Sequence, residues 1–558
     1  MKIKKFTKFW PWLLILLLCW WAVKPLFHSG FFSMHDDTQV VRVQQMAQAL
    51  KDGQFPVRWV KDLGYGYGYP IFNFYAPLAY YIGAIFNLIG FDALAATKIV
   101  FGLGIILAGI FMYLLAREFW GVWGGIVSAL FYLYAPYHAL DIYVRGAVGE
   151  FWAMAFLPLV FYGLYRIAQG HRRGVITTAL ALTAVILVHN LTAMMFIPFL
   201  FLMLFILFIF QKDKKRFVIW NLKFVILAAG LAAFYWLPAL TEMKLTKVFG
   251  QIGGGANWRD HFVFFDQLWA SPWGFGGSAP GRLDGMSFMI GKIHLLVAGL
   301  VLLIAIAKKK LRPVLLVSLG FLLIVLFLTN DASGFIWQTI PVMAFIQYPW
   351  RFLAFSTLAV SFMAGSLISW QPKKLNWWPA VISSVFIIGL LVLNTKYFQP
   401  QTFLGVTAAG YINEENIKWK ISKISDEYLP KEFPVPQSKE EIAWEKVKVI
   451  EGEAEIKSQD FKHHLYQLEI EARTDSQILV NTAYFPGWRI FVDDEKVAPR
   501  IEAGRIKFAL NPGAHRVILK FVNTPVRRLA NLISLLSLAG LGLGMLKYLY
   551  GRTRISRD

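Results

Sequence analysis

Cysteine is almost absent from this sequence. The single thiol, Cys19, lies within the first apolar run of the chain. One cysteine excludes an intramolecular disulfide and a cysteine-based metal site, so any domain outside a membrane must fold without disulfides. The chain also contains no Gly-x-x-x-x-Gly-Lys-Ser/Thr loop, no His-Glu-x-x-His and no Gly-x-Ser-x-Gly sequence. The sequence therefore carries none of the usual motifs of P-loop nucleotide sites, zinc proteases or serine hydrolases.

Charged residues are scarce as well. They form 16% of the 558 residues, whereas 57% are hydrophobic and the mean hydropathy is +0.51. This balance excludes an ordinary soluble domain. The net charge of +22 comes from Lys and Arg near the ends of apolar runs rather than from one soluble face, so we expect no nucleic-acid partner.

The most prominent feature of the sequence is its series of long apolar runs. A helix needs roughly 20 apolar residues to cross ~30 Å of hydrocarbon, and many runs have this length. We read the first run as a retained helix, because no small-residue cleavage motif follows it. The runs predict about twelve spanning helices, at 8–27, 94–115, 121–137, 151–168, 175–190, 193–210, 218–240, 289–307, 313–328, 352–370, 377–394 and 528–548.

The basic residues set the predicted orientation, since Lys and Arg concentrate in cytoplasmic loops. A cytoplasmic N-terminus places every basic cluster inside: Lys2, Lys4, Lys5 and Lys8, then Arg172–Arg173, 212–216, 308–312, Lys373–Lys374 and 552–557. Counting the apolar segment Phe74–Gly90 as a span would invert all later loops, so we place it on the outer surface. The prediction is a multi-pass plasma-membrane protein with both termini in the cytoplasm.

Residues 395–527 lose the long apolar runs. Short β-prone segments such as Gln477–Val480, Trp488–Val492 and Val517–Val522 alternate there with turn sequences. We predict three parts: a transmembrane domain at 1–394 with an external loop at 28–93, an extracytoplasmic β-rich domain at 395–527, and a final span with a cytoplasmic tail at 528–558. His463 and His464 are predicted as a solvated pair in the β-rich domain.

An acidic pair follows the first span. His35, Asp36 and Asp37 precede a run in which apolar residues recur at helical spacing up to Gly53. One reading is that one Asp caps this helix. The other is that an ionised Asp at the membrane exit acts as a general base or orients a metal ion. We favour one capping and one catalytic carboxylate.

Further polar residues fall on the same predicted outer side. Arg145 and Glu150 stand just before one span, and His189 and Asn190 end another. Polar groups at membrane depth are costly and often functional. A structural ion pair between Arg145 and Glu150, and a hydrogen-bonded packing role for His189, are the alternatives to substrate binding.

The last candidate lies before the span at 352–370. Tyr348, Trp350 and Arg351 belong to the sequence Tyr-Pro-Trp-Arg-Phe. The planar guanidinium of Arg351 is suited to bind two phosphate oxygens of a lipid carrier. The alternative is an arginine that merely extends to the membrane interface.

These motifs resemble known families over nearly the whole chain. The acidic motif after the first helix, the Tyr-Pro segment of the first external loop and the spread of spans resemble the GT-C superfamily of membrane glycosyltransferases. More specific resemblance is to bacterial YfhO-like proteins and the so-called 6-pyruvoyl-tetrahydropterin synthase-related membrane family. It is carried by four motifs: Arg145–Gly146 with Glu150, His189–Asn190, Tyr348–Phe352 and Tyr484–Trp488.

The resemblance implies a glycosyltransferase of the cell envelope with a GT-C-like transmembrane fold. Such an enzyme transfers a sugar from a polyprenyl-phosphate donor to an extracytoplasmic acceptor, such as a cell-wall or surface polymer. Asp36 or Asp37 would be the base, and Arg351, with Arg145 or His189, would stabilise the departing phosphate. The sequence identifies no definite cofactor; a divalent metal near the carboxylates is compatible with the scheme, although no ligand set for it is defined. The alternatives are a transporter or flippase of lipid-linked sugars and a non-catalytic scaffold.

Overall fold

The computed structural model describes residues 9–251, 256–369 and 377–555. The chain forms two compact units that alternate along the sequence. Unit 1 contains residues 1–36, 98–228 and 252–405, and unit 2 contains residues 37–97, 229–251 and 406–558. The predicted cytoplasmic residues Lys2, Lys4, Lys5, Lys8, Lys373, Lys374 and Arg557 lie outside the described residues.

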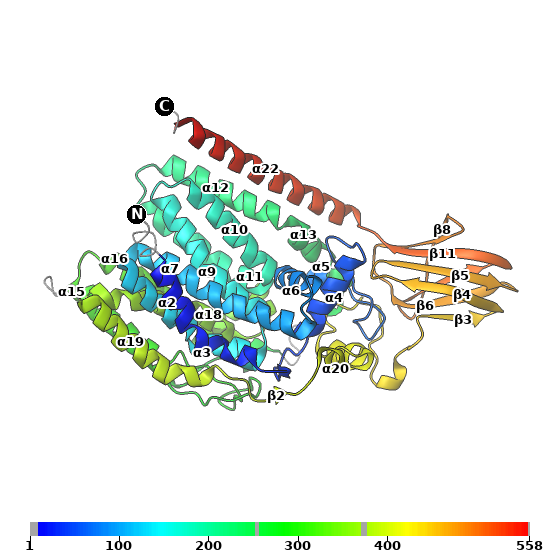
Figure 1. The fold of residues 1–558 in the computed structure, drawn as a ribbon, viewed down its shortest axis with the longest axis horizontal. Helices are drawn as coiled ribbons and strands as arrows, with labels where there is room; N and C mark the ends of the chain where they lie inside the picture. The colour runs from blue at the N-terminus through cyan, green and yellow to red at the C-terminus, as the bar shows by residue number, and fades with distance from the viewer. Residues whose placement is uncertain (1–8, 252–255, 370–376, 556–558) are drawn as a thin grey trace. The chain divides into compact units, whose positions relative to one another are not determined.

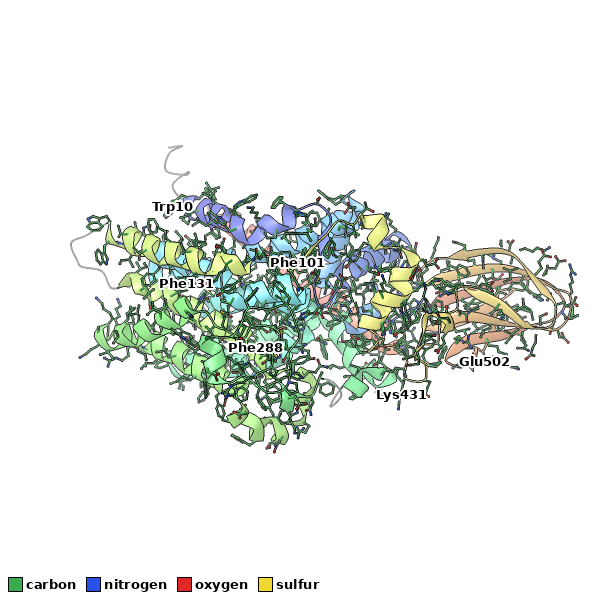
Figure 2. The ribbon with its side chains drawn as sticks, turned by 90° about the horizontal axis from the view of Figure 1, so that it is seen from below. Trp10, Phe101, Phe131, Phe288, Lys431 and Glu502 are labelled. Atoms are coloured by element: carbon green, nitrogen blue, oxygen red, sulfur yellow. The ribbon has the colours of Figure 1, made fainter. Side chains whose placement is uncertain are left out.

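Unit 1 is helical, and its helices coincide with predicted spans (Figure 1). The main ones are α2 (Trp10–Leu18), α3 (Trp20–Val23), α7 (Ala93–Leu133), α9 (Val148–Ala168), α10 (Arg173–Val188), α11 (Asn190–Ile209), α12 (Lys214–Leu231), α15 (Lys292–Ala307), α16 (Arg312–Thr329), α18 (Leu353–Ala364) and α19 (Trp378–Asn394). The first residues of α7 and the last of α12 fall in unit 2. Figure 2 shows Phe101 and Phe131, both on α7, among these helices, and both are fully buried.

Glycines allow close helix contacts in unit 1. Gly121 has φ +70° and divides α7, which explains why the sequence predicts two spans there. Farther on, α9 and α10 pack side by side (Figure 1), and a Cβ at Gly163 would lie 2.2 Å from Thr178 Oγ1. Small residues at such contacts let helix backbones approach in a membrane, where burial of apolar side chains gives little drive for association.

Fewer helices than the predicted twelve spans have the length and apolar composition that a membrane crossing needs. Among the described residues, seven helices are long and apolar enough to cross a membrane, or up to nine if two bent helix pairs each count as one span. The pairs are 10–18 with 20–27 and 214–231 with 233–245, while α10 and α15 are shorter apolar helices. The multi-pass character is confirmed, and the count of twelve and the sidedness stay predictions.

Unit 2 combines helices with the β-rich part of the chain. Its main helices are α4 (Gln39–Lys51), α5 (Ile71–Phe74), α6 (Leu78–Leu88), α13 (Ala233–Glu242) and α22 (Pro525–Ile555). Helix α6 has 11 residues, about half the length needed to cross a bilayer. This agrees with excluding Phe74–Gly90 from the spans, and its place on the outer surface stays a prediction.

The predicted β-rich region is confirmed. It forms two antiparallel sheets, one ordered β3-β6-β10-β9 and one ordered β4-β5-β11-β7-β8 (Figure 1). The strands are β3 (Val447–Glu451), β4 (Ala454–Phe461), β5 (Leu465–Ala472), β6 (Ser476–Ala483), β7 (Trp488–Val492), β8 (Glu495–Val497), β9 (Arg500–Glu502), β10 (Arg505–Leu510) and β11 (Gly513–Phe521). Buried and exposed residues alternate along β5 and β10, as expected where one face of each sheet is covered.

Tight turns set the register of the hairpins. Asp493 and Asp494, between β7 and β8, have φ +49° and +68°, and Ala503 and Gly504, between β9 and β10, have +47° and +73°. Two consecutive positive φ values are typical of the turn whose twist matches antiparallel strands. The exposed Glu502, on the neighbouring strand β9, is labelled in Figure 2.

The Gly64–Pro70 loop is part of the protein core of unit 2. Tyr65, Tyr67 and Tyr69 are at most 5% exposed. The carbonyl of Tyr67 accepts a 2.7 Å hydrogen bond from the backbone N–H of Ala483, so the loop continues the packing of strand β6. A Cβ at Gly68 would lie 2.4 Å from the Trp59 indole, which requires glycine there. The alternation of Gly and Tyr therefore packs a loop against a sheet.

Candidate functional site

The candidate site in unit 1 is built on an irregular turn between α8 (Pro136–Ala139) and α9. Residues Leu140–Arg145 form a π-helical turn that ends at Gly146, with φ +67°. A Cβ on Gly146 would lie 2.2 Å from Met34 Sδ, so glycine lets the segment after the first span approach. The backbone N–H groups of His35 and Asp36 donate to the carbonyls of Val144 and Arg145, at 3.0 and 2.8 Å.

Two arginines and two acids meet at this turn. Arg145 Nη1 contacts Asp141 Oδ1 and lies 2.9 Å from Glu150 Oε2. Arg351 Nε lies 3.8 Å from the same Glu150 oxygen. Asp141 and Glu150 are at most 2% exposed. The positive charges of the two arginines and the negative charges of the two acids offset the cost of burying each other, which for a lone charge would be several kcal/mol.

Aromatic rings surround the charges. The Tyr137 hydroxyl donates a 2.5 Å hydrogen bond to Glu150 Oε1. Arg145 Cζ lies 4.5 Å from the centre of the Trp350 ring, a cation–π contact. Tyr348 and Trp350 stack at 5.0 Å with 27° between their planes, and Arg351 Cζ lies 5.1 Å from the Tyr348 ring. Tyr348, Trp350 and Arg351, predicted as one motif, are therefore brought to Arg145 and Glu150.

Of the His189–Asn190 motif, only the histidine faces this cluster. A Cβ on Gly149 would lie 3.2 Å from His189 Cδ2, so the imidazole lies against the start of α9. His189 Nδ1 lies 2.7 Å from Thr192 Oγ1 and accepts from the Thr192 backbone N–H at 3.3 Å, which caps α11. Asn190 is exposed and its carbonyl oxygen accepts from the N–H of Leu191.

The acidic pair is divided between the two units. Asp36 belongs to unit 1, whereas Asp37 belongs to unit 2, where its carboxylate accepts a hydrogen bond from the Tyr411 hydroxyl of α20 (Ala408–Tyr411). Burial raises the pKa of Asp37 to about 6. The expectation that an Asp caps the following helix is wrong: the N-cap of α4 is Thr38, whose side chain makes no capping hydrogen bond. The helix itself, with Val40, Val43, Met46 and Ala47 buried, is confirmed.

The described residues contain no defined set of metal ligands. Across residues 9–251, 256–369 and 377–555, no group of three or more His, Cys, Asp or Glu side chains lies close enough to hold an ion. We assign no residue to a metal.

Asp141, Tyr137 and Tyr411 are the residues that sequence reasoning missed. Asp141 is the only acid in the apolar stretch Pro136–Val144 and stands four residues before Arg145. A buried acid one helical turn from a buried base is a pairing signal that could have been used. Nothing in the local sequence marks Tyr411, because its contact with Asp37 joins residues 374 positions apart.

Similarities to known proteins include one family model and several solved structures. The model of the 6-pyruvoyl-tetrahydropterin synthase related domain, a membrane protein, matches residues 72–251. The arabinofuranosyltransferase AftD from Mycobacteria is similar in structure with a TM-score of 0.45 and 15% identity, covering 71% of this chain and 27% of AftD. The archaeal oligosaccharyltransferase AglB from Archaeoglobus fulgidus, solved with an inhibitory peptide and a dolichol-phosphate, gives 0.47 and 12%, covering 78% of this chain and 61% of AglB.

This chain thus spans less than two thirds of either neighbour. No curated protein matches it. As its motifs predict, the chain is similar over residues 72–251 to the 6-pyruvoyl-tetrahydropterin synthase related membrane domain.

Proposed function

We propose that this protein is a membrane glycosyltransferase that moves a sugar from a polyprenyl-phosphate donor to an extracytoplasmic acceptor. The observation that carries the proposal is the buried cluster of Asp141, Arg145, Glu150 and Arg351, to which the backbone of Asp36 is hydrogen-bonded. The cluster combines fixed cations for a phosphate with a nearby carboxylate for a base. Reaction of a lipid-phosphate sugar requires both.

Asp36 is the base in this proposal. It deprotonates the acceptor hydroxyl as the hydroxyl oxygen forms a bond to the anomeric carbon. The bond from that carbon to the phosphate oxygen breaks, and its electron pair leaves with the lipid phosphate. A single displacement inverts the anomeric centre. Asp37, with its carboxylate bound by Tyr411, anchors the start of α4 instead.

Arg351 receives the departing phosphate. Its Nη1 donates to the carbonyl of Ile346 at 2.8 Å, while its buried Nε makes no hydrogen bond to any described residue. Since Glu150 lies 3.8 Å from that Nε, the ionic contact is loose and the guanidinium retains a donor for a phosphate oxygen. Arg145, held by two carboxylates, positions the cluster, and the stacked rings of Tyr348 and Trp350 offer a face to a sugar.

The test is mass spectrometry of surface polymers from cells that lack the gene and carry equal amounts of wild type, Asp36→Asn, Asp37→Asn or Arg351→Lys. We expect wild type and Asp37→Asn to restore a sugar modification, and Asp36→Asn to reduce it by roughly 10²–10⁴-fold. Arg351→Lys keeps the positive charge but loses the planar guanidinium that can bind two phosphate oxygens, so this variant should restore the sugar modification only in part.

The outcomes separate the alternatives. Loss with Asp37→Asn and not with Asp36→Asn would exchange the two roles and keep the transferase. Full restoration by every variant would refute the proposed chemistry and favour a transporter of lipid-linked sugars or a scaffold.

A further inference from the structure

Unit 2 contains a cavity that plays no part in the proposed transfer. Its volume is about 230 Å³, and its lining includes Arg58, His464, Lys520 and Asn523 together with the rings of Phe55 and Phe521. The described residues that line it include no carboxylate. The cavity therefore combines cationic and neutral hydrogen-bonding residues with two phenylalanines, a composition suited to a small anion.

Asp52, which precedes the lining residue Gly53 in the chain, is hydrogen-bonded to His463. Asp52 Oδ2 accepts from the backbone N–H of His463 and lies 2.7 Å from its Nδ1. His463 is 1% exposed, so the expectation of a solvated histidine pair is wrong for this residue. Its neighbour His464 lines the cavity, and His464 Nδ1 is buried without a hydrogen-bond partner among the described residues.

Arg58, which lines the cavity, and Arg527, which contacts the lining residue Phe521, carry more positive charge than the carboxylate near them balances. Arg58 and Arg527 are 2% and 0% exposed, and one carboxylate, Glu242, lies 2.9 Å from Arg527 Nε. Arg58 donates to neutral oxygens: Asn73 Oδ1, Asn531 Oδ1 and the Phe234 carbonyl, at 2.8–2.9 Å.

Several of their donors are unused. Arg58 Nε and both Nη atoms of Arg527 are buried and make no hydrogen bond to any described residue. Arg527 Cζ lies 4.9 Å from the ring of Phe521, which itself lines the cavity. Unused donors and unbalanced charge are costly when buried, so a bound anion would stabilise this region.

The position of the cavity in the chain indicates where the anion comes from. Val522 and Asn523 line it, and the apolar span Pro525–Leu546 begins two residues later. Phe55, at the cavity, is 76% exposed and contacts Tyr81 of α6. Ile85 of this helix and Ile89, which follows it, are exposed as well. The cavity thus lies at the entry of a spanning helix and beside exposed apolar side chains, where lipid headgroups are found.

We propose that this cavity binds the phosphate group of an anionic membrane lipid, separately from the site in unit 1. Lys520 and His464 contact the phosphate from the open side, and Arg58 supplies the buried positive charge. The aromatic rings of Phe55 and Phe521 pack against the rest of the headgroup.

The first arm of the test uses the purified full-length protein in a neutral detergent. Thermal unfolding is followed by tryptophan fluorescence as inorganic phosphate replaces chloride at constant ionic strength. The second arm compares nanodiscs of phosphatidylcholine with nanodiscs that also contain phosphatidylglycerol. Wild type is compared with Lys520→Gln, which changes an exposed residue, and with Lys496→Gln, a matched exposed lysine outside the cavity.

We expect phosphatidylglycerol to raise the melting temperature of wild type and Lys496→Gln. Lys520→Gln should need roughly fivefold more anionic lipid for the same shift. Stabilisation by inorganic phosphate as well would confirm the anion site in both arms. Stabilisation by phosphate alone would overturn the headgroup assignment. Equal responses of Lys520→Gln and Lys496→Gln, or no response to either anion, would overturn the site.

Discussion

The two clusters of buried arginines described above differ in how many carboxylates lie beside them. In unit 1, Arg145 and Arg351 face two buried carboxylates. In unit 2, Arg58 and Arg527 have a single carboxylate near them, that of Glu242. A balanced group is stable without a ligand and can hold a reacting geometry, whereas an unbalanced group gains most from binding an anion.

The carboxyl group of Asp37 is expected to make the stability of the folded protein depend on pH. Its pKa in the folded protein is about 6 because of burial, against about 3.9 in an unfolded chain. The folded state therefore binds this proton more tightly. The stability that it contributes is complete below pH ~4 and is lost as the pH rises to about 6.

Asp37→Asn removes this dependence, because asparagine stays neutral. We expect the variant to be more stable than wild type by about 3 kcal/mol at pH 7 and nearly equal to it near pH 4. Thermal unfolding in detergent from pH 4 to pH 8 measures the difference. A difference independent of pH would show that the pKa of Asp37 is the same in the folded and unfolded states, which would contradict the effect of burial.

At the level of secondary structure, apolar runs and turn residues predicted most elements, because both depend on local sequence. The strand segments near residues 477, 488 and 517 lie within β6, β7 and β11. The break in α7 at Gly121 coincides with the predicted start of a new span.

What local patterns could not predict was which distant segments pack together. The alternation of Gly and Tyr at 64–70 does not indicate which residues cover this loop, and in the structure residues beyond 410 do so, including Lys418 and Ala483. The same reason applies to the site. The motifs around Arg145 and Arg351 were found separately in the sequence, whereas the contact of Tyr411 with Asp37 could be seen only in the fold.

Close packing at the start of α9 gives a prediction for Gly149. A Cβ there would lie 2.7 Å from the carbonyl oxygen of Val188, which is backbone and cannot move aside easily. Gly149→Ala should destabilise the protein by roughly 1–3 kcal/mol and displace His189 from the cluster.

Gly320 provides the matched control, since it lies inside helix α16 and a Cβ there would meet no atom within 4 Å. Gly320→Ala should leave stability unchanged or raise it slightly, because alanine favours a helix over glycine. Scanning fluorimetry compares the two variants. Equal melting temperatures would contradict the packing argument.

For the whole molecule, orientation in the membrane is the property that most limits the proposed function. Cys19 is the only cysteine, so a Cys19→Ser background makes every introduced thiol unique. We expect Asp494→Cys, on an exposed turn of the β-rich part, to react with a membrane-impermeant maleimide on intact cells. Lys309→Cys should react only after permeabilisation. The reverse pattern would place the β-rich part in the cytoplasm.

The alternation of the two units along the chain has a consequence for biosynthesis. Residues 37–97 leave the ribosome early, but the backbone of Tyr67 bonds to Ala483, and Tyr65 and Tyr69 bond to residues 426 and 428. At 5–20 residues per second, roughly 20–80 s pass before strand β6 is made. During that time the tyrosine-rich segment lacks its partner on strand β6, although Tyr69 can already pair with Val60. The protein therefore completes unit 2 only near the end of translation, and this segment is where we expect membrane chaperones to act.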